Sequence, residues 1–243
     1  MKKGLYYVLL ILFVGIFAFS AYKVGSYYYA RWQSSKQTQQ IIDQYVKPAG
    51  EPEPQGDPDR ITVNFDGLLQ ENSDVAAWIY CANTNINYPV MQGSDNDYYL
   101  SHLMDGSYNA GGSIFMECSN QADFSDRNTI LYGHHMKNGS MFANLMNFKK
   151  SGYYEQHDHM YIMTPQCTYR LDLLAGAVVD PDDAIYSTYP TQAAIDSIMS
   201  RSSFQSAVPL PGEEGRLVTL STCSYEYDDA RYVVLGVLTQ VES

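Results

Sequence analysis

Cys223 and Arg231 are the two residues of this sequence whose types and spacing best fit covalent chemistry. The segments beside them, residues 217–223 and 231–241, are rich in apolar and β-branched residues, which predicts two strands. The residues between these segments are polar and acidic, so we expect a loop that closes a hairpin. Cys223 then ends one strand and Arg231 begins the next. A thiol beside a guanidinium is a candidate nucleophile with an oxyanion donor.

Ser221 should lie on the same face of its strand as Cys223, because side chains alternate along a strand. Leu220 and Thr222 then share the opposite face. The alternative interpretation makes Cys223 a small buried apolar residue and Arg231 a surface charge, which is the commoner case for an arbitrary Cys–Arg pair. The surrounding motifs favour the chemical interpretation.

Those motifs resemble the sortases, the cell-wall cysteine transpeptidases of Gram-positive bacteria. TLSTC is followed eight positions later by Arg231, and NTILYGHHM at residues 128–136 supplies a histidine after a strand and a glycine. The stretches NTNINYPVMQGSDNDYYL and GSIFMECSN precede these in an order that resembles class B sortases in particular. The similarity extends from Phe65 to Val241, nearly all of the globular part.

The resemblance implies a mainly β fold with added helices, an eight-stranded sortase-type β-barrel, and a Cys–His–Arg site. Residue by residue, it makes Cys223 the nucleophile, His134 the proton carrier and Arg231 the oxyanion and substrate clamp. Ser221 and Asn96 match positions that line the family's substrate groove. The family implies neither a metal nor another cofactor.

The implied substrates are surface proteins with a C-terminal sorting signal, cleaved at a Thr–Gly or Thr–Asn type of bond through a thioester. The implied acceptor is an amine of the cell-wall precursor. Two alternatives stay open: a class B pilin polymerase that uses a pilin lysine, and a cysteine peptidase that only hydrolyses. Some members have an acidic residue directly after the cysteine, whereas this chain has Ser224, so no carboxylate partner is assigned there.

The other histidines carry weaker signals. His135 is the rival of His134, and because adjacent residues of an extended chain point in opposite directions, only one of them can face Cys223. His157 and His159 form an H-x-H pair that could ligate a metal, but a surface strand is the simpler interpretation. His102 follows a tyrosine-rich turn and carries no signal of its own.

The N-terminus predicts a membrane anchor over residues 1–23. An uncharged apolar run of 19 residues follows Lys3, and at 1.5 Å per residue it spans roughly 28 Å, close to the thickness of the hydrocarbon core. The alternative is a signal peptide cleaved after the small-residue site at residues 18–20. We expect an uncleaved anchor with the catalytic domain, residues 61–243, outside the cell.

Residues 24–60 are predicted to be a stalk helix, over residues 27–46, followed by a proline-rich acidic spacer. The net charge of −12, without any basic stripe, argues against nucleic acid as a partner. The four cysteines, at positions 81, 118, 167 and 223, match no small disulfide scaffold, although a bridge between Cys81 and Cys167 stays open.

Three helices are predicted inside the globular part, and the first is a short one within residues 64–80 that precedes the strand at residues 77–81. Ser140 should cap one that runs to Lys150, with Met141, Leu145 and Phe148 on its apolar face. Thr191 should cap another, over residues 191–202, with Ile195, Ile198 and Met199 on its apolar stripe. Short strands are expected at residues 77–81, 83–90, 113–117 and 128–132, with a hairpin from HMYIMTP and TYRLDLLAGAVV.

Overall fold

The computed structural model describes residues 2–48 and 61–241, and the chain divides into two compact units, Met1–Gln40 and Ile41–Ser243. Most of the predicted spacer, residues 49–60, lies outside the described residues.

The first unit consists of most of helix α1 (Lys2–Tyr45). Its apolar side chains between Leu5 and Tyr22 are exposed. In the described part of the chain, α1 is the one helix that is long and apolar enough to cross a membrane, by length and composition alone. An anchor and a signal sequence both meet that description. The helix predicted over residues 27–46 is the C-terminal part of α1.

The second unit begins with the last turn of α1. Strand β1 (Val46–Pro48) pairs antiparallel with β2 (Ile61–Val63), two strands too short to be evident in the sequence. Helix α2 (Phe65–Glu71) follows, capped by the Asn64 side chain. The Tyr45 hydroxyl donates to the Glu71 carboxylate at 3.0 Å. The compact unit therefore starts before the predicted domain boundary at residue 61.

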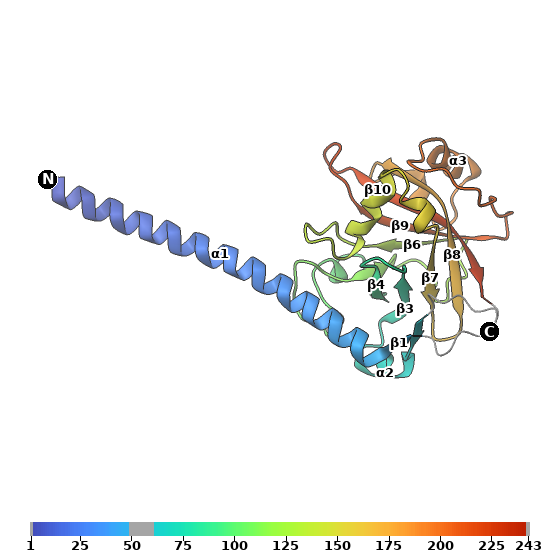
Figure 1. Ribbon diagram of the computed structural model, residues 1–243, viewed down its shortest axis with the longest axis horizontal. Coiled ribbons are helices and arrows are strands. Elements are labelled where there is room, and N and C mark those ends of the chain that lie inside the picture. Colours follow the sequence, from blue (N-terminus) through green and yellow to red (C-terminus); the bar gives the residue numbers. More distant parts are fainter. Residues whose placement is uncertain (1, 49–60, 242–243) are drawn as a thin grey trace. The chain divides into compact units, whose positions relative to one another are not determined.

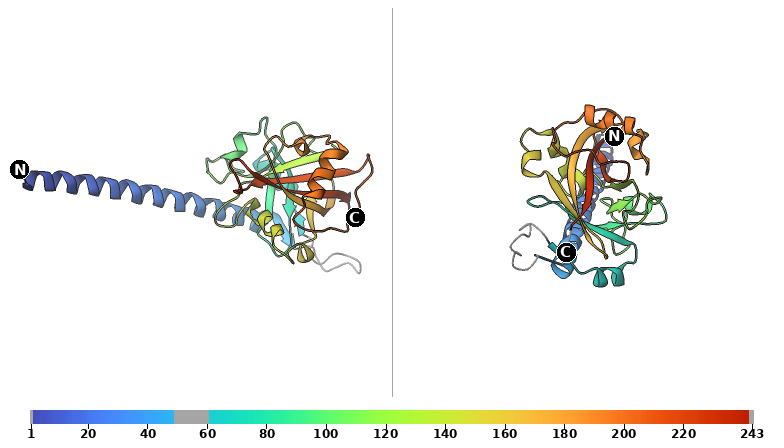
Figure 2. Two further views of the ribbon diagram at one scale, coloured as in Figure 1. Left: turned by 90° about the horizontal axis from the view of Figure 1, so that it is seen from above. Right: turned by 90° about the vertical axis from the view of Figure 1, so that its right-hand side faces the viewer.

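Eight strands form a closed barrel in the order β10-β8-β7-β3-β4-β5-β6-β9, as the resemblance implied (Figures 1 and 2). Their bounds are β3 (Val75–Tyr80), β4 (Asn87–Met91), β5 (Ile114–Met116), β6 (Asn128–Tyr132), β7 (His159–Met163), β8 (Thr168–Val179), β9 (Arg216–Cys223) and β10 (Arg231–Gln240). The strand expected from residue 83 begins only at Asn87, because Asn83 adopts a positive φ of 59° in a turn.

Two of the pairings are parallel, β4 with β5 and β6 with β9, and the others in the barrel are antiparallel. β9 therefore has β6 on one side and β10 on the other. Because β6 and β9 run in the same direction, the residues that follow both strands lie at the same end of the barrel. The predicted histidine motif and the predicted cysteine motif meet at that end.

Apolar side chains fill the barrel and cover part of its outer surface. The interior cluster includes Ile79, Val90, Leu131, Leu220 and Val234, all fully buried. On the outside, helix α3 (Gln192–Ser200) and the 3-10 turn η4 (Ala184–Tyr186) cover apolar residues of β8, β9 and β10 (Figure 2). Buried methyl and methylene groups at these contacts each contribute about 0.8 kcal/mol of transfer free energy.

The Thr191 cap of α3 is confirmed, because its hydroxyl accepts from the Ala194 N–H at 3.3 Å. Ile195 and Ile198 are buried on the predicted stripe. Met199 was expected there too, and this expectation is wrong, because its side chain is exposed. The α-helical part ends at Ser200 rather than at residue 202.

The helix predicted from Ser140 to Lys150 is a 3-10 helix, η2 (Phe142–Lys149). Ser140 is not its cap, because the Ser140 hydroxyl bonds the Asn138 side chain at 2.7 Å instead. The chain enters η2 through Met141, whose φ is 55°. The apolar face is as predicted, since Met141, Leu145 and Phe148 are all buried. Two further single turns, η1 (Tyr98–Leu100) and η3 (Tyr154–Gln156), complete the fold.

Candidate active site

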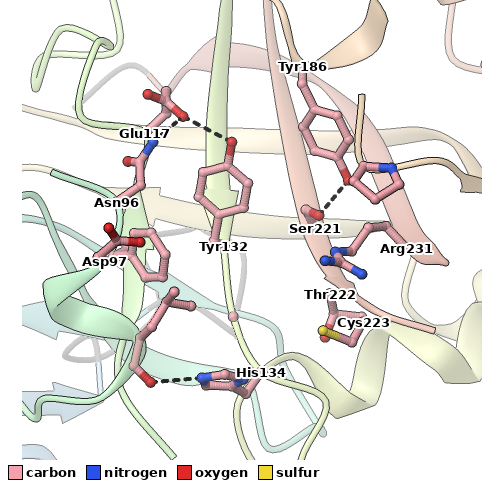
Figure 3. A pocket seen from close by; sticks show the side chains of 14 residues that line it. Asn96, Asp97, Glu117, Tyr132, His134, Tyr186, Ser221, Thr222, Cys223 and Arg231 are labelled. Carbon is pink, nitrogen blue, oxygen red and sulfur yellow. Dashed lines mark hydrogen bonds between the residues drawn. The ribbon is translucent and has the colours of Figure 1, made fainter. Parts of the chain in front are cut away.

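A cleft of about 460 Å³ lies where β6 and β9 end and β10 begins. All five residues that the sequence analysis assigned to a site line it: Asn96, His134, Ser221, Cys223 and Arg231 (Figure 3). The remaining lining residues are Asp97, Leu100, Phe115, Glu117, Tyr132, Gly133, Pro181, Tyr186 and Thr222. The cleft thus gathers residues that are more than 130 positions apart in the sequence, from Asn96 to Arg231.

Cys223 and Arg231 lie directly opposite each other in the ladder between β9 and β10. Directly opposite residues of an antiparallel pair project from the same face, so the thiol and the guanidinium share one side of the hairpin. The guanidinium is held by its Nη1 atom, which donates to the carbonyls of Asp229 at 2.7 Å and Ala230 at 3.2 Å. Its Nε and Nη2 atoms remain available as donors, since within the described residues these two carbonyls are its hydrogen-bond acceptors.

His134 follows β6 after Gly133, at the cleft wall. Glycine is required before it because a side chain there would collide with Ile114 and Phe142. The Nε2 atom of His134 lies 2.8 Å from the Leu100 carbonyl oxygen. A carbonyl can only accept, so Nε2 carries the proton and the neutral ring has its lone pair on Nδ1. This contact fixes the tautomer and leaves Nδ1 as the nitrogen that can exchange a proton.

His135, the rival histidine, is bonded differently. Its Nδ1 atom lies 3.0 Å from the Cys223 carbonyl oxygen, and its ring packs against Tyr225 at 5.1 Å between centroids. Like His134 it contacts a carbonyl, but this contact is with the backbone of the cysteine rather than across the cleft. His135 is not among the residues that line the cleft. The sequence did not reveal this contact between His135 and the hairpin.

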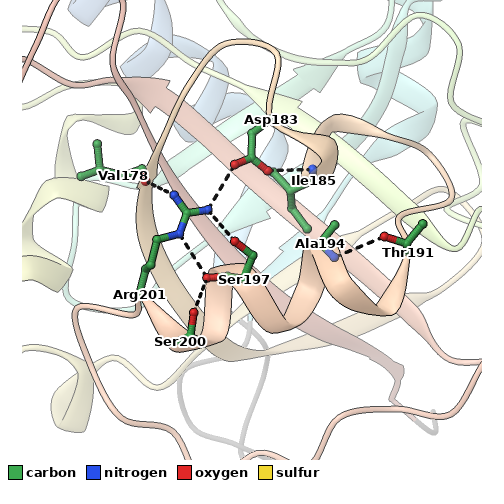
Figure 4. Close-up of polar contacts among 8 residues, drawn as sticks. All are labelled: Val178, Asp183, Ile185, Thr191, Ala194, Ser197, Ser200 and Arg201. Carbon is green, nitrogen blue, oxygen red and sulfur yellow. Dashed lines mark hydrogen bonds and ion pairs between the residues drawn. The ribbon is translucent and has the colours of Figure 1, made fainter.

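One wall of the cleft is built by the segment that carries η4. Tyr186 at its end shares a hydrogen bond of 2.8 Å with the Ser221 hydroxyl. Burial raises the pKa of Tyr186 to about 12, so this hydroxyl is neutral in the working range of an enzyme. In the same segment the Asp183 carboxylate caps η4 by accepting from the Ile185 N–H. Arg201 donates to this carboxylate and to the Val178 carbonyl (Figure 4). The Ser221 side chain is therefore held by a braced partner.

The opposite side of the cleft is organised by the Glu117 carboxylate. It accepts from the Asn96 side-chain amide at 2.8 Å and from the Tyr132 hydroxyl at 3.0 Å (Figure 3). Asn96 in turn accepts from the Cys118 N–H at 2.8 Å. Burial alone would raise the pKa of Glu117, but hydrogen bonds from Asn96, Ser119 and Tyr132 together lower it below its ordinary value. Burial and the Glu117 charge raise the pKa of Tyr132.

A family model described as the sortase domain matches residues 79–239, well over half of the chain and the whole of the cleft. This chain belongs to the sortase family. The Sortase B of Listeria monocytogenes is 31% identical over 236 residues, which cover 93% of this chain and 93% of that protein. The predicted class is confirmed by this relative: the protein is a class B sortase, a cysteine transpeptidase.

Solved sortase structures agree with the fold. The Staphylococcus aureus sortase B–substrate complex superimposes with a TM-score of 0.73 at 26% identity, over 87% of this chain and 99% of that one. A Streptococcus pyogenes class B sortase involved in pilus biogenesis is 32% identical, with a TM-score of 0.66 over 73% of this chain and 98% of that one. Members of the family act on sorting signals and amine acceptors.

The sortase cleft combines a thiol, an imidazole and a guanidinium with a neutral hydroxyl pair and a charged carboxylate. A transpeptidase needs a nucleophile, a group that moves a proton and a donor to an oxyanion, and the first three side chains supply those types. The cation of Arg231 and the anion of Glu117 lie on different sides of the cleft (Figure 3). A peptide bound between them meets a positive group on one side and a negative group on the other.

Sequence reasoning missed Glu117, Tyr132 and Tyr186 as cleft residues. Glu117 and Tyr132 each end a predicted strand, as Cys223 does, so the ends of strands were the available signal. Tyr186 lies in a loop turn that no motif marks. Its contact with Ser221 spans 35 residues and depends on the barrel.

Proposed function

We propose that Cys223 is the nucleophile of this sortase, His134 its proton carrier and Arg231 its oxyanion donor. The observation that carries this assignment is the register of β9 and β10, which sets Cys223 opposite Arg231 in the same cleft as His134. Ser221 and Asn96 complete the proposal as substrate-binding residues. Asn96 acts there together with Glu117, to which its amide is bonded.

In the first half-reaction the Cys223 thiolate attacks the carbonyl carbon of the scissile bond. The negative charge that develops on the carbonyl oxygen is stabilised by the N–H groups of Arg231. The C–N bond then breaks, and the protonated Nδ1 of His134 gives its proton to the departing amine. The products are a thioester on Cys223 and a released C-terminal fragment.

In the second half-reaction an acceptor amine attacks the thioester carbonyl. His134 Nδ1 takes the proton of the amine as the new C–N bond forms, and Arg231 again stabilises the oxyanion. The C–S bond breaks and the Cys223 thiolate returns. Because Nε2 stays bonded to the Leu100 carbonyl, one nitrogen serves both proton transfers without rotation of the ring.

The proposed donor substrate is a surface protein with a C-terminal sorting signal, cleaved at a Thr–Gly or Thr–Asn type of bond. The proposed acceptor is an amine of the peptidoglycan precursor, which places the reaction at the outer face of the cell membrane. Transfer to a pilin lysine is the second candidate, because a class B sortase involved in pilus biogenesis is 32% identical to this chain.

The test uses the full chain in detergent micelles with a panel of sorting-signal peptides, with or without an amine acceptor. Mass spectrometry distinguishes the products. A ligated product that needs Cys223 supports the transpeptidase roles, and comparison of a precursor amine with a pilin lysine peptide decides the acceptor. Acid product alone in the presence of both amines would identify a peptidase instead.

The membrane topology is proposed as a single span over residues 1–23, with residues 24–60 as a stalk and spacer, and the domain over residues 61–243 outside the cell. The exposed apolar residues of α1 support an anchor. Cells that express the full chain should keep it in the membrane fraction, accessible to external protease. Release of a mature form that begins near Ala21 would identify a cleaved signal.

A further inference from the structure

Lys149, the last residue of η2, contacts Ser224 and Tyr232, the residues that directly follow Cys223 and Arg231. Its Nζ atom donates to the hydroxyl of Ser224 at 3.2 Å, and Ser224 follows Cys223. The same atom lies 4.6 Å from the centre of the Tyr232 ring, and Tyr232 follows Arg231. One ammonium group therefore bridges the two strands at the mouth of the hairpin.

The loop between these strands is held by the same group. Lys149 forms an ion pair with Glu226 in the middle of the loop, and Glu226 also accepts from the Ser224 hydroxyl. The Lys149 and Ser224 hydrogen bonds lower the pKa of Glu226 to about 2, so its carboxylate is charged throughout the range in which an enzyme works. The side chain of Lys149 is 24% exposed and that of Glu226 is 43% exposed, so the pair is partly screened by water.

The other end of η2 is fixed to the histidine. The Phe142 N–H donates to the His134 carbonyl at 3.1 Å, and the Phe142 ring packs against Gly133. Phe142, Leu145 and Phe148 are buried, so η2 is anchored in the core between these two attachments. The first residue of this short helix is thus hydrogen-bonded to His134, and its last residue contacts the residues beside Cys223 and Arg231.

We propose that Lys149 is a positioning residue of the transpeptidase, which sets the Cys223–Arg231 hairpin at a fixed distance from His134 through Ser224, Glu226 and Tyr232. The proposal rests on the proposed catalytic roles of the three residues. Its physical basis is that proton transfer and oxyanion binding depend steeply on geometry, and a misplacement of 1 Å can lower a rate by about 100-fold. Lys149 itself needs no contact with the substrate.

A surface ion pair without effect on activity is the competing explanation, since many partly exposed pairs contribute little. The arrangement argues against it, because Lys149 makes three contacts and two of them are with immediate neighbours of cleft residues. Lys150 gives the contrast. Its Nζ atom donates to the side chain of Asn147, three residues earlier in the chain, at 2.8 Å.

The experiment compares Lys149→Met and Glu226→Gln with the matched control Lys150→Met, all in the full chain. Methionine keeps much of the apolar stem of lysine and removes its charge. We expect each of the first two variants to lower kcat about 10-fold, with KM within twofold of the wild type and a melting temperature near that of Lys150→Met. Lys149→Arg should recover most of the rate, because the guanidinium keeps the charge and the donors.

Two further measurements separate positioning from other roles. The double variant Lys149→Met, Glu226→Gln should lose no more than about twofold beyond Lys149→Met alone, because that change already removes the ion pair that Glu226→Gln weakens. The shape of the pH–rate profile should be unchanged in Lys149→Met. A lost alkaline limb would instead make Lys149 a proton-transfer group and would overturn the positioning role.

Hydrogen exchange of the loop amides, residues 224–230, tests the proposal without the reaction. We expect faster exchange in Lys149→Met and Glu226→Gln than in Lys150→Met. If the wild type forms no ligated product, the proposed function fails while this exchange result still stands. If the wild type is active and Lys149→Met keeps its kcat within twofold, the positioning role is wrong. Should Lys149→Met fail to fold, Glu226→Gln decides by the same criteria.

Discussion

Two sets of cleft residues are attached in different ways: within the described residues, the side chains of Arg231 and His134 are hydrogen-bonded to backbone carbonyls alone, whereas the Glu117 carboxylate is bonded to the side chains of Asn96 and Tyr132. The first arrangement leaves N–H donors of Arg231 and the Nδ1 lone pair of His134 without a partner among the described residues. The second satisfies Glu117, Asn96 and Tyr132 among themselves before any ligand arrives.

This difference teaches what each set of residues can contribute to catalysis. Groups with unused donors gain most when charge develops in the transition state, so they change kcat. A network that is already complete offers a fixed shape and potential to substrate and transition state alike, so it changes KM. We therefore expect mutations in the two sets to have different kinetic effects, on kcat in the first set and on KM in the second.

The largest effect should come from Cys223→Ala, which removes the nucleophile and should lower activity by on the order of 10⁴-fold or more. Cys118→Ser is the matched control, because Cys118 is an exposed free thiol beside the opposite side of the cleft. It should keep nearly full activity. Product formation by mass spectrometry is the measurement, and substantial ligation by Cys223→Ala would remove the thiol from the mechanism.

Arg231→Lys should lower kcat by on the order of 10²–10³, as for other oxyanion-hole deletions. Lysine keeps the charge but presents one movable donor group instead of a planar fork. KM and the melting temperature should change much less, because Arg231 lies at the end of its strand. Steady-state kinetics check this, and a kcat near that of the wild type would make Arg231 a bystander.

Tyr132→Phe removes the hydroxyl that donates to Glu117 and keeps the ring. We expect KM to rise about 3- to 10-fold with kcat within twofold, because the preformed network loses one hydrogen bond to a charged group, on the order of 1.5–3 kcal/mol, and only part of that free energy acts on substrate binding. Tyr169→Phe is a control, since its hydroxyl contacts Arg216 outside the cleft. A fall in kcat alone would place Tyr132 with the reactive groups and would erase the distinction between the two sets of residues.

The smallest effect is a pH dependence of stability. The folded-state pKa of Glu117 is lowered, so its charged form stabilises the fold above the ordinary carboxyl pKa, and this contribution is lost as the pH falls below about 4.5. Glu117→Gln lacks the charge at every pH. The difference in melting temperature between wild type and variant should therefore be largest near neutral pH and shrink on acidification. A difference that grows on acidification would contradict the sign of the shift.

The hairpin could be predicted from sequence because its information is local. The strands expected at residues 217–223 and 231–241 are observed as Arg216–Cys223 and Arg231–Gln240, within a residue at each end. Alternation and a polar loop between two apolar runs suffice to define such a unit. The direct pairing of Cys223 with Arg231 follows from the same local pattern.

The rest of the cleft could not be predicted from local patterns. The parallel pairing of β6 with β9 joins Asn128 to Leu217, and no turn motif encodes contacts at that separation. The bond between Asn96 and Glu117 spans 21 residues and a strand. Ser140 illustrates the opposite failure, because its hydroxyl had a nearer partner in Asn138 than the helix it was expected to cap. The family resemblance, rather than periodicity, supplied His134 and Asn96.

The parallel pairing of β6 with β9 also limits which insertions and deletions this enzyme tolerates. Deleting one residue from β9 would shift its register by one and turn Cys223 toward the apolar interior of the barrel. Only insertions or deletions of an even number of residues in this strand keep Cys223 on the same face of the sheet. The segment around Tyr186 lies outside these strands. Insertions there can alter which peptides are accepted while the reactive side chains keep their places, so designers seeking new substrates should vary this loop first.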